Sequence, residues 1–267
     1  MGAFYTYRKD DWMIVYEQND SYIMIRQHEH ALLSGQLANK LDRNYWPDLS
    51  YQHDVLYAIH HHDRGWKSLD EVPIWNDANQ IPFSFMDYPL PVKLDYYIKG
   101  IEEVHKYSSY AAYLCSKHYQ SFFKNATSPK GVSFYNDENK RQKALLQDFN
   151  IQEDLFTFHY HLLQFFDDLS LYVCFQDPGV HKSDELSWFK EGFSQPFYFL
   201  SKDERIVANW IDESTISLSH PLISTEERFA VQLKRVPKHL VAQKGISAAY
   251  HATSTEHRSF RILPPES

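Results

Sequence analysis

Two neighbouring residues in this sequence, a histidine and an aspartate, could together carry out metal-dependent chemistry. His62 and Asp63 lie within the run AIHHHDRGW, which spans residues 58–66. Imidazole and carboxylate groups are ligands for divalent metals such as Zn, Mn and Fe. The chain contains 15 histidines, however, and a second pair, His53-Asp54, precedes the first. Such a pair arises by chance in this composition, so its position in the fold must decide its role.

The two pairs differ in their position on a helix that is predicted over residues 50–62. Residues three, four and seven positions apart share one face of a helix. The positions that precede His62 on its face are all apolar: Val55, Ala58 and Ile59. His62 and Asp63 therefore border the core, where a carboxylate is costly unless it is paired, and we predict a cation as its partner. His53-Asp54 stands before the first apolar turn, where water can solvate it.

Two other predicted helices place ligand-type residues at the edge of an apolar face. His30 opens a helix that begins near residue 28, on the same face as two leucines. Asp167 lies in a segment, residues 153–175, that is apolar nearly all round and is typical of a buried central helix. Its neighbour Asp168 has more polar residues four and seven positions away. Asp167 is the preferred ligand, and Asp168 stays open as the alternative.

The rest of the chain predicts mostly helices, with strands at both ends. Short β-rich runs on either side of Asn19 and Asp20 predict a hairpin, and strand-like runs return in the last third of the chain, over residues 197–200, 215–219, 228–236 and 259–263. We predict a mainly α fold, a helical bundle with an added small β-sheet. The predicted parts are a hairpin that joins the C-terminal sheet (1–26), a helical metal-binding domain (27–176) and a strand-rich C-terminal region (177–267).

Composition narrows the possible partners and the location. The net charge of -8 argues against bulk nucleic-acid binding, which depends on an excess of Lys and Arg. No apolar run approaches the roughly 18 to 20 residues that cross a bilayer, and the first residues are too polar for a signal peptide. We therefore expect a cytoplasmic protein that does not bind membranes. The sequence leaves the oligomeric state open.

The ligand order and its flanking segments resemble the HD-domain superfamily of metal-dependent phosphohydrolases. HALLSGQLA contains His30, YAIHHHDRGW contains His62-Asp63, and FFDDLSLY contains Asp167. The resemblance covers roughly residues 25–175. The basic residue that often follows the Gly in that superfamily is replaced by Trp66, with Lys67 next. The whole chain also resembles an uncharacterised bacterial family with HHDRGW-like segments.

This resemblance implies an HD-like bundle in which His30, His62, Asp63 and Asp167 hold one divalent metal (Mn, Fe, Zn, Co, Ni or Mg). Such a cation lowers the pKa of bound water and polarises a phosphoryl oxygen, so hydroxide can attack a small phosphate ester such as a nucleotide. The candidate phosphate donors are Arg64, Lys67 and Lys117. Trp66 and Trp75 are the candidates for holding the substrate, since Trp75 begins an aromatic, proline-rich loop.

Two alternatives remain at this point. His105 and His118 extend apolar stripes between the HD pair and Asp167, and relatives of this kind with extra histidines hold a second metal. If both were ligands, an HD-like di-iron oxygenase would be possible. His118 is preferred of the two, since it lies beside Lys117 on a helix that looks core-facing. The other alternative is a non-catalytic regulatory or partner-binding protein on an HD scaffold, with the C-terminal strands as the partner surface.

Overall fold

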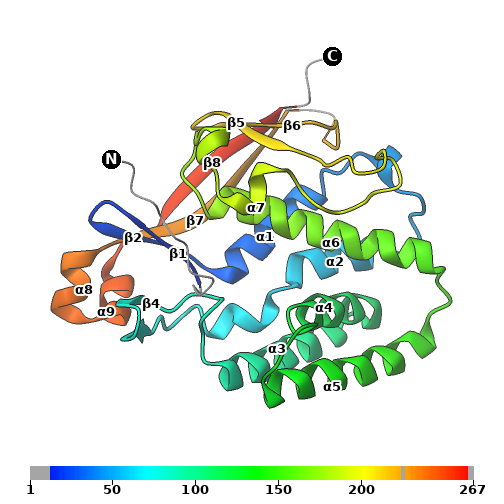
Figure 1. The fold of residues 1–267 in the computed structure, drawn as a ribbon, viewed down its shortest axis with the longest axis horizontal. Helices are drawn as coiled ribbons and strands as arrows, with labels where there is room; N and C mark the ends of the chain where they lie inside the picture. Colours follow the sequence, from blue (N-terminus) through cyan, green and yellow to red (C-terminus); the bar gives the residue numbers. More distant parts are fainter. Residues whose placement is uncertain (1–12, 224–225, 264–267) are drawn as a thin grey trace.

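The computed structural model describes residues 13–223 and 226–263 and contains a bundle of helices against a large sheet (Figure 1). Helices make up 49% and strands 18% of the structure, and six of the strands form one curled half-barrel sheet. The prediction of a mainly α fold with a small sheet is therefore wrong, and the fold is mixed α/β. Each strand-like run is weak in the sequence, and only pairing with distant segments makes it part of a large sheet. Residues 1–12 and 264–267, at the ends of the predicted parts, lie outside the described residues.

The sheet joins both ends of the described chain. Its strand order is β1-β2-β7-β8-β6-β5, and the strands are β1 (Ile14–Gln18), β2 (Ser21–Ile25), β5 (Ala208–Asp212), β6 (Thr215–Leu218), β7 (Glu227–Pro237) and β8 (Glu256–Leu263). The long strand β7 pairs with β2 through its C-terminal half and with β8 through the rest, antiparallel in both cases. Strand β6 pairs with β8 in parallel. The hairpin β1-β2 therefore lies beside strands that come two hundred residues later in the chain.

Both faces of the hairpin are covered, which explains its nearly continuous apolar sequence. Ile14 and Ile23 belong to the main hydrophobic core, whereas their neighbours Val15 and Met24 belong to a second, smaller core. This alternation follows from the two-residue period of a strand. The smaller core is completed by two short helices, α8 (Lys238–Lys244) and α9 (Ile246–Ala252).

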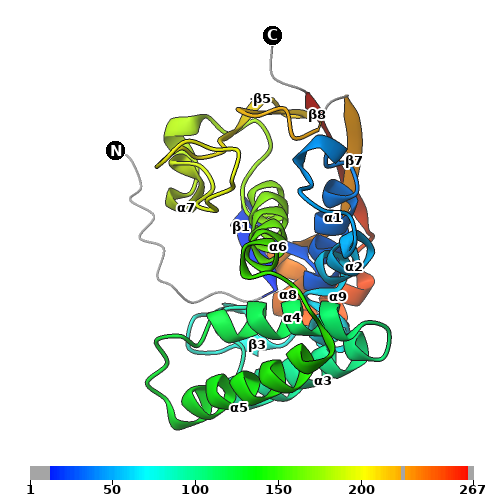
Figure 2. The same ribbon diagram turned by 90° about the vertical axis from the view of Figure 1, so that its right-hand side faces the viewer.

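The helices that position the site lie on the other side of the sheet. Helix α1 (Gln27–Ala38) packs against α2 (Gln52–His61), α6 (Glu153–Cys174) and strand β7. As predicted, α6 is largely buried and lies at the centre of the helices (Figure 2). Helix α4 packs against α2 and α6, with α3 and α5 outside it. Their bounds are α3 (Leu90–His105), α4 (Ser109–Ser121) and α5 (Pro129–Leu145).

The remaining elements are short. They are the 3-10 turns η1 (Arg43–Tyr45), η2 (Arg64–Ser68), η3 (Leu146–Asp148) and η4 (Lys182–Asp184), helix α7 (Ser187–Lys190), and a two-stranded ribbon of β3 (Trp75–Asn76) and β4 (Ile81–Pro82). Among the described residues, no helix combines the length and the apolar character needed to cross a membrane.

Candidate metal centre

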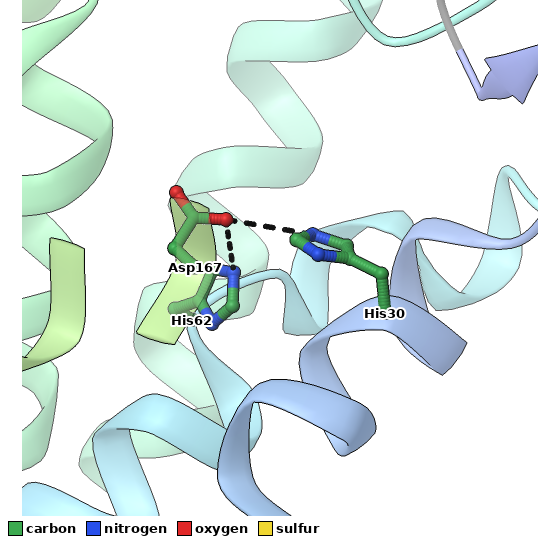
Figure 3. A group of neighbouring side chains, drawn as sticks. All are labelled: His30, His62 and Asp167. Atoms are coloured by element: carbon green, nitrogen blue, oxygen red, sulfur yellow. Dashed lines mark ion pairs between the residues drawn. The ribbon is translucent and has the colours of Figure 1, made fainter. Parts of the chain in front are cut away.

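Side chains from three helical segments converge next to α6. His30 comes from the first turn of α1, His62 directly follows α2, and Asp167 lies in the middle of α6 (Figure 3). The Nε2 atom of His62 lies 3.3 Å from Oδ1 of Asp167, and Nε2 of His30 lies 3.8 Å from the same oxygen. Both imidazoles are buried, with 1% or less of each side chain exposed. Two imidazole nitrogens and a carboxylate oxygen therefore surround one point.

Asp63 and His118 complete the group. Oδ2 of Asp63 lies 2.9 Å from Nε2 of His30 and 3.9 Å from Nε2 of His62. His118, on α4, places its Nε2 atom 3.7 Å from Oδ2 of Asp167. We call His30, His62, Asp63, His118 and Asp167 the His/Asp cluster.

The spacing of the His/Asp cluster fits a shared cation. Ligand atoms about 2.0 to 2.2 Å from one metal lie about 3 to 4.4 Å from one another, depending on the angle at the metal. The five nitrogen–oxygen distances given above run from 2.9 to 3.9 Å. Two overlapping triads, His30-His62-Asp167 and His62-Asp63-His118, each have ligand atoms within 4.8 Å of one another. Imidazole and carboxylate donors together favour Zn, Mn, Fe, Co or Ni over Ca.

Hydrogen bonds on the outer side of each ring leave the inner nitrogen facing the cluster. His62 donates from Nδ1 to the carbonyl oxygen of Ile59 at 2.8 Å. Ser170 donates to the carbonyl oxygen of Asp167, so the ring of His30 donates from Nδ1 to the Ser170 hydroxyl at 2.7 Å. Nε2 of His30 lies within hydrogen-bond distance of Oδ2 of Asp63, at 2.9 Å, and both Nε2 atoms face the carboxylates on the side where a metal ion would bind, as in metal sites with an oriented histidine. Within the described part of the chain, the buried Nε2 of His62 makes no hydrogen bond.

The buried charges also point to a cation. Burial opposes the charged form of His62, but Asp167 and Asp63 outweigh it and raise the pKa of His62 to about 9. The pKa of Asp167 is lowered, since the neighbouring histidines more than offset the effect of its burial. Burial lowers the pKa of His118 to about 4. The two carboxylates thus hold a positive charge at His62, and a metal ion would replace that proton.

Backbone contacts hold the turn after Asp63 in place. A Cβ atom on Gly65 would lie 2.4 Å from the carbonyl oxygen of Tyr96, and one on Gly100 would lie 2.5 Å from the amide nitrogen of Gly65. Helix α3 can therefore approach this turn only because both residues are glycine. Asp70, also buried, accepts a hydrogen bond from the backbone N–H of His28 at 3.0 Å. This bond caps the start of α1, two residues before His30.

The His/Asp cluster opens into a pocket with a volume of about 340 Å³. Its polar and charged lining residues are Gln27, His30, Asp63, His118, Asp167, Asp168, Ser194 and Arg205. Its aromatic lining residues are Trp66, Phe85, Tyr97, Phe122, Trp188, Phe189 and Phe193. The pocket thus combines ligand-type groups with a mostly aromatic wall, as many small-molecule sites do.

The other predicted site residues are distributed differently. Trp66 lines the pocket, whereas Trp75 lies on β3 and contacts Tyr22. His105 is exposed at the end of α3 and does not belong to the His/Asp cluster. Arg64 forms an ion pair with Glu103 at 2.8 Å. Lys67 is exposed, Lys117 is half-buried, and neither lines the pocket.

Asp168 lines the pocket but is not part of the His/Asp cluster. Gln195 donates a hydrogen bond to its Oδ2 atom at 2.7 Å. Burial and the charge of Asp167 raise the pKa of Asp168 to about 7. Asp167 is thus the aspartate of this pair that meets the histidines.

Sequence reasoning missed Ser170 and Arg205. Ser170 is one turn beyond Asp167 on α6, where a helical count from Asp167 could have found it. Arg205 lies in an irregular segment before β5, and no periodic pattern places it near the histidines.

The fold and site define a mixed α/β protein with a buried histidine-aspartate centre at the base of an aromatic pocket. The family described as "Protein of unknown function (DUF3891)" matches residues 13–238, and the chain belongs to this family. No curated protein matches the chain. No solved structure matches it either. None of these comparisons links the chain to the HD-domain superfamily, so that resemblance stays a prediction.

Proposed function

We propose that the chain is a metal-dependent phosphohydrolase that acts on a small phosphate ester. The observation that carries the proposal is the convergence of His30, His62, Asp63 and Asp167 at the base of the pocket, where the buried Nε2 of His62 makes no hydrogen bond within the described residues. Burying two carboxylates so close together is costly without a cation to balance them. His118 is placed to be a fifth ligand or to bind a second ion.

Different residues of the chain would have different roles in hydrolysis. A divalent cation, when bound, lowers the pKa of a water molecule and polarises a phosphoryl oxygen. Once a metal ion replaces the proton at His62, His30 and His62 would present unprotonated Nε2 atoms to it, oriented by Ser170 and by the Ile59 carbonyl. Phe85 and Trp66 line the pocket beside these ligands and limit the access of bulk water, which strengthens electrostatic interactions there.

Metal analysis followed by a hydrolysis screen tests the proposal. The purified protein is loaded in turn with Mn, Fe, Zn, Co, Ni and Mg and assayed with p-nitrophenyl phosphate and nucleoside monophosphates. We expect about one metal ion per chain and metal-dependent release of phosphate. Asp167→Asn and His62→Ala should remove both, while His105→Ala, a change at an exposed histidine outside the His/Asp cluster, should preserve both.

Two outcomes contradict parts of the proposal. If His62→Ala retains all of its bound metal, the ligand assignment is wrong. If metal binds at the His/Asp cluster but no phosphate ester is hydrolysed, the site is not a phosphohydrolase centre, and the non-catalytic metal-binding alternative gains support. We do not propose the di-iron oxygenase, because it required His105, which lies outside the cluster.

A further inference from the structure

The pocket contains one basic side chain that the proposed chemistry does not yet use. Arg205 is the single Lys or Arg among the residues that line the pocket in the described part of the chain. No ion pair joins it to a carboxylate among the described residues, whereas Arg64 is paired with Glu103. Arg205 is exposed and has no ion-pair partner in the part of the chain that the structure describes, so it is available to a ligand.

The segment that carries Arg205 is firmly held. Phe193 and Ile206 form an antiparallel bridge, in which the Phe193 amide donates to the Ile206 carbonyl at 2.8 Å. Gly192 has a φ of 79°, and a Cβ atom there would lie 3.3 Å from Cβ of Arg205. Arg205 is thus fixed beside the pocket wall, because the bridge and this close approach both determine where its backbone lies.

A lysine ties the same wall to the sheet. Nζ of Lys182 donates to the carbonyl oxygens of Phe189, at 3.0 Å, and Ala208, at 2.9 Å, and also binds Glu185 at 2.7 Å. These bonds connect helix α7 to strand β5. The wall is therefore a built part of the fold, and it holds the backbone that carries Arg205.

The charges around Arg205 indicate what it would bind. The acidic side chains that line the pocket are Asp63, Asp167 and Asp168. A metal ion in the His/Asp cluster would balance the first two. An anionic substrate still needs a donor that does not belong to the cluster, and a guanidinium binds phosphate or carboxylate oxygens in a bidentate manner.

Two exposed aromatic rings stand at the same pocket. Phe122, which follows α4, is 52% exposed, and Trp188, on α7, is 51% exposed. Helices α4 and α7 lie on different sides of α6 (Figures 1 and 2). Large aromatic groups left open to solvent beside a pocket are typical of surfaces that contact a ligand. Phe122 and Trp188 therefore offer two exposed aromatic rings to a ligand in the pocket.

We propose that the substrate is a phosphate ester with a planar aromatic ring, whose anionic oxygens bind Arg205 and whose ring contacts Phe122 and Trp188. This inference rests on the proposed function, because it names the class of ester that the same site takes. A ring of this kind can be a simple aryl group or a nucleobase. Both share the flat apolar face that the two side chains would contact.

Binding of phosphonates, which the protein cannot hydrolyse as esters, tests the proposal separately from turnover. Calorimetry on the metal-loaded protein compares phenylphosphonate with methylphosphonate. We expect phenylphosphonate to bind about three- to tenfold more tightly, owing to ring contacts. Trp188→Ala should remove this preference without changing the affinity for methylphosphonate.

The arginine is tested with the same probes. Arg205→Gln should weaken both phosphonates about ten- to hundredfold, since a charge-assisted contact is lost, and Arg205→Lys should recover part of the loss. Arg228→Gln is the matched control, because Arg228 is 79% exposed on β7 and does not line the pocket. Thermal unfolding checks that each variant is folded.

The outcomes of these binding experiments distinguish a nucleobase from a simple aryl group as the ring. They also distinguish a failure of this inference from a failure of the proposed function. Tighter binding of the non-hydrolysable phosphonate analogue of adenosine monophosphate than of the corresponding analogue of ribose 5-phosphate, lost in Trp188→Ala, supports the inference with a nucleobase as the ring. Equal binding of these two, with phenylphosphonate still preferred over methylphosphonate, supports it with a simple aryl group. Unchanged affinity in Arg205→Gln, or equal affinity for the two phosphonates, overturns it. Arg205-dependent binding without any hydrolysis contradicts only the proposed function.

Discussion

Nε2 of His62 lies 3.3 Å from Oδ1 of Asp167, although His62 follows α2 and Asp167 lies on α6, at distant points of the sequence. Within the described residues, Nε2 of His62 makes no hydrogen bond, neither to Oδ1 of Asp167 nor to another atom. The His62 side chain is fully buried and that of Asp167 is only 13% exposed, so an unbalanced carboxylate is costly there. This relationship links the stability of the chain to whatever positive charge lies between the two side chains, a proton or a metal ion.

Removal of metal should lower thermal stability. A ligand that binds only the folded state stabilises it by about 2.7 kcal/mol at a hundredfold excess over its dissociation constant. We expect a chelator to lower the melting temperature by several degrees and added Mn or Zn to restore it, as measured by calorimetry. In Asp167→Asn the melting temperature should change neither with the chelator nor with added Mn or Zn. A full response in that variant would place the bound metal elsewhere in the chain.

Ser170→Ala should weaken metal binding without changing a ligand. The Ser170 hydroxyl orients the ring of His30, and loss of such a contact typically costs about ten- to hundredfold in metal affinity. Competition with a metal-sensitive dye measures the change. Ser133→Ala, at an exposed position on α5, is the control and should keep the affinity of the original chain. Equal affinities for the two variants would show that Ser170 does not position His30.

Gly100→Ala should destabilise the fold strongly. The new methyl group would lie 2.5 Å from the Gly65 nitrogen and 2.8 Å from its Cα atom, and both are backbone atoms that cannot rotate away. Overpacking of this kind costs about 1 to 3 kcal/mol, and it also moves the turn that follows Asp63. Urea unfolding measures the loss. Glu102→Ala, at an exposed position of the same helix, should change stability by less than about 0.5 kcal/mol.

His159 should make the fold sensitive to acid. Burial lowers its pKa from 6.5 to about 4, and Tyr110 forms a 2.8 Å hydrogen bond with its Nδ1 atom. The unfolded chain therefore binds a proton between these pH values while the folded chain does not. Stability is complete above about pH 6.5 and falls as the pH drops toward 4, by up to about 1.4 kcal/mol per pH unit for this group.

Urea unfolding at pH 7 and pH 5 tests the contribution of His159. His159→Gln cannot take up the proton, so its free energy of unfolding should fall less between the two pH values than that of the original chain. His53→Gln, a change to a histidine outside the buried core, should retain the full acid sensitivity. If the His159 and His53 variants lose the same amount of stability, other buried histidines carry the acid response.

Several features of the site follow from local sequence patterns. The apolar turn before His62, the apolar helix around Asp167 and the helical face of His30 are all visible as spacings of three, four and seven residues. The preference for Asp167 over Asp168 rested on the same counts, and Asp167 is the one that meets the histidines. Of His118 and His105, only His118 lies in the His/Asp cluster, and its role as a ligand stays a prediction.

Other features could not be predicted in this way. The size of the sheet depends on β7, which pairs with β2 from the start of the chain and with β8 from its end. The candidate phosphate donors were chosen for their nearness in sequence to His62 and His118. In the folded chain Arg64 pairs with Glu103 instead, and Arg205 reaches the pocket from a segment far away.

The sequence by itself determined which residues border the apolar faces of α1, α2 and α6, because the period of a helix is a local property of the backbone. Only the tertiary structure decided that these faces meet at one point, that α3 approaches through Gly65 and Gly100, and that Arg205 and Trp188 complete the pocket. Those contacts depend on how whole surfaces pack, and packing depends on the shapes of many side chains at once. The run AIHHHDRGW contains two residues of the site, His62 and Asp63, and the fold brings the other members of the His/Asp cluster to them.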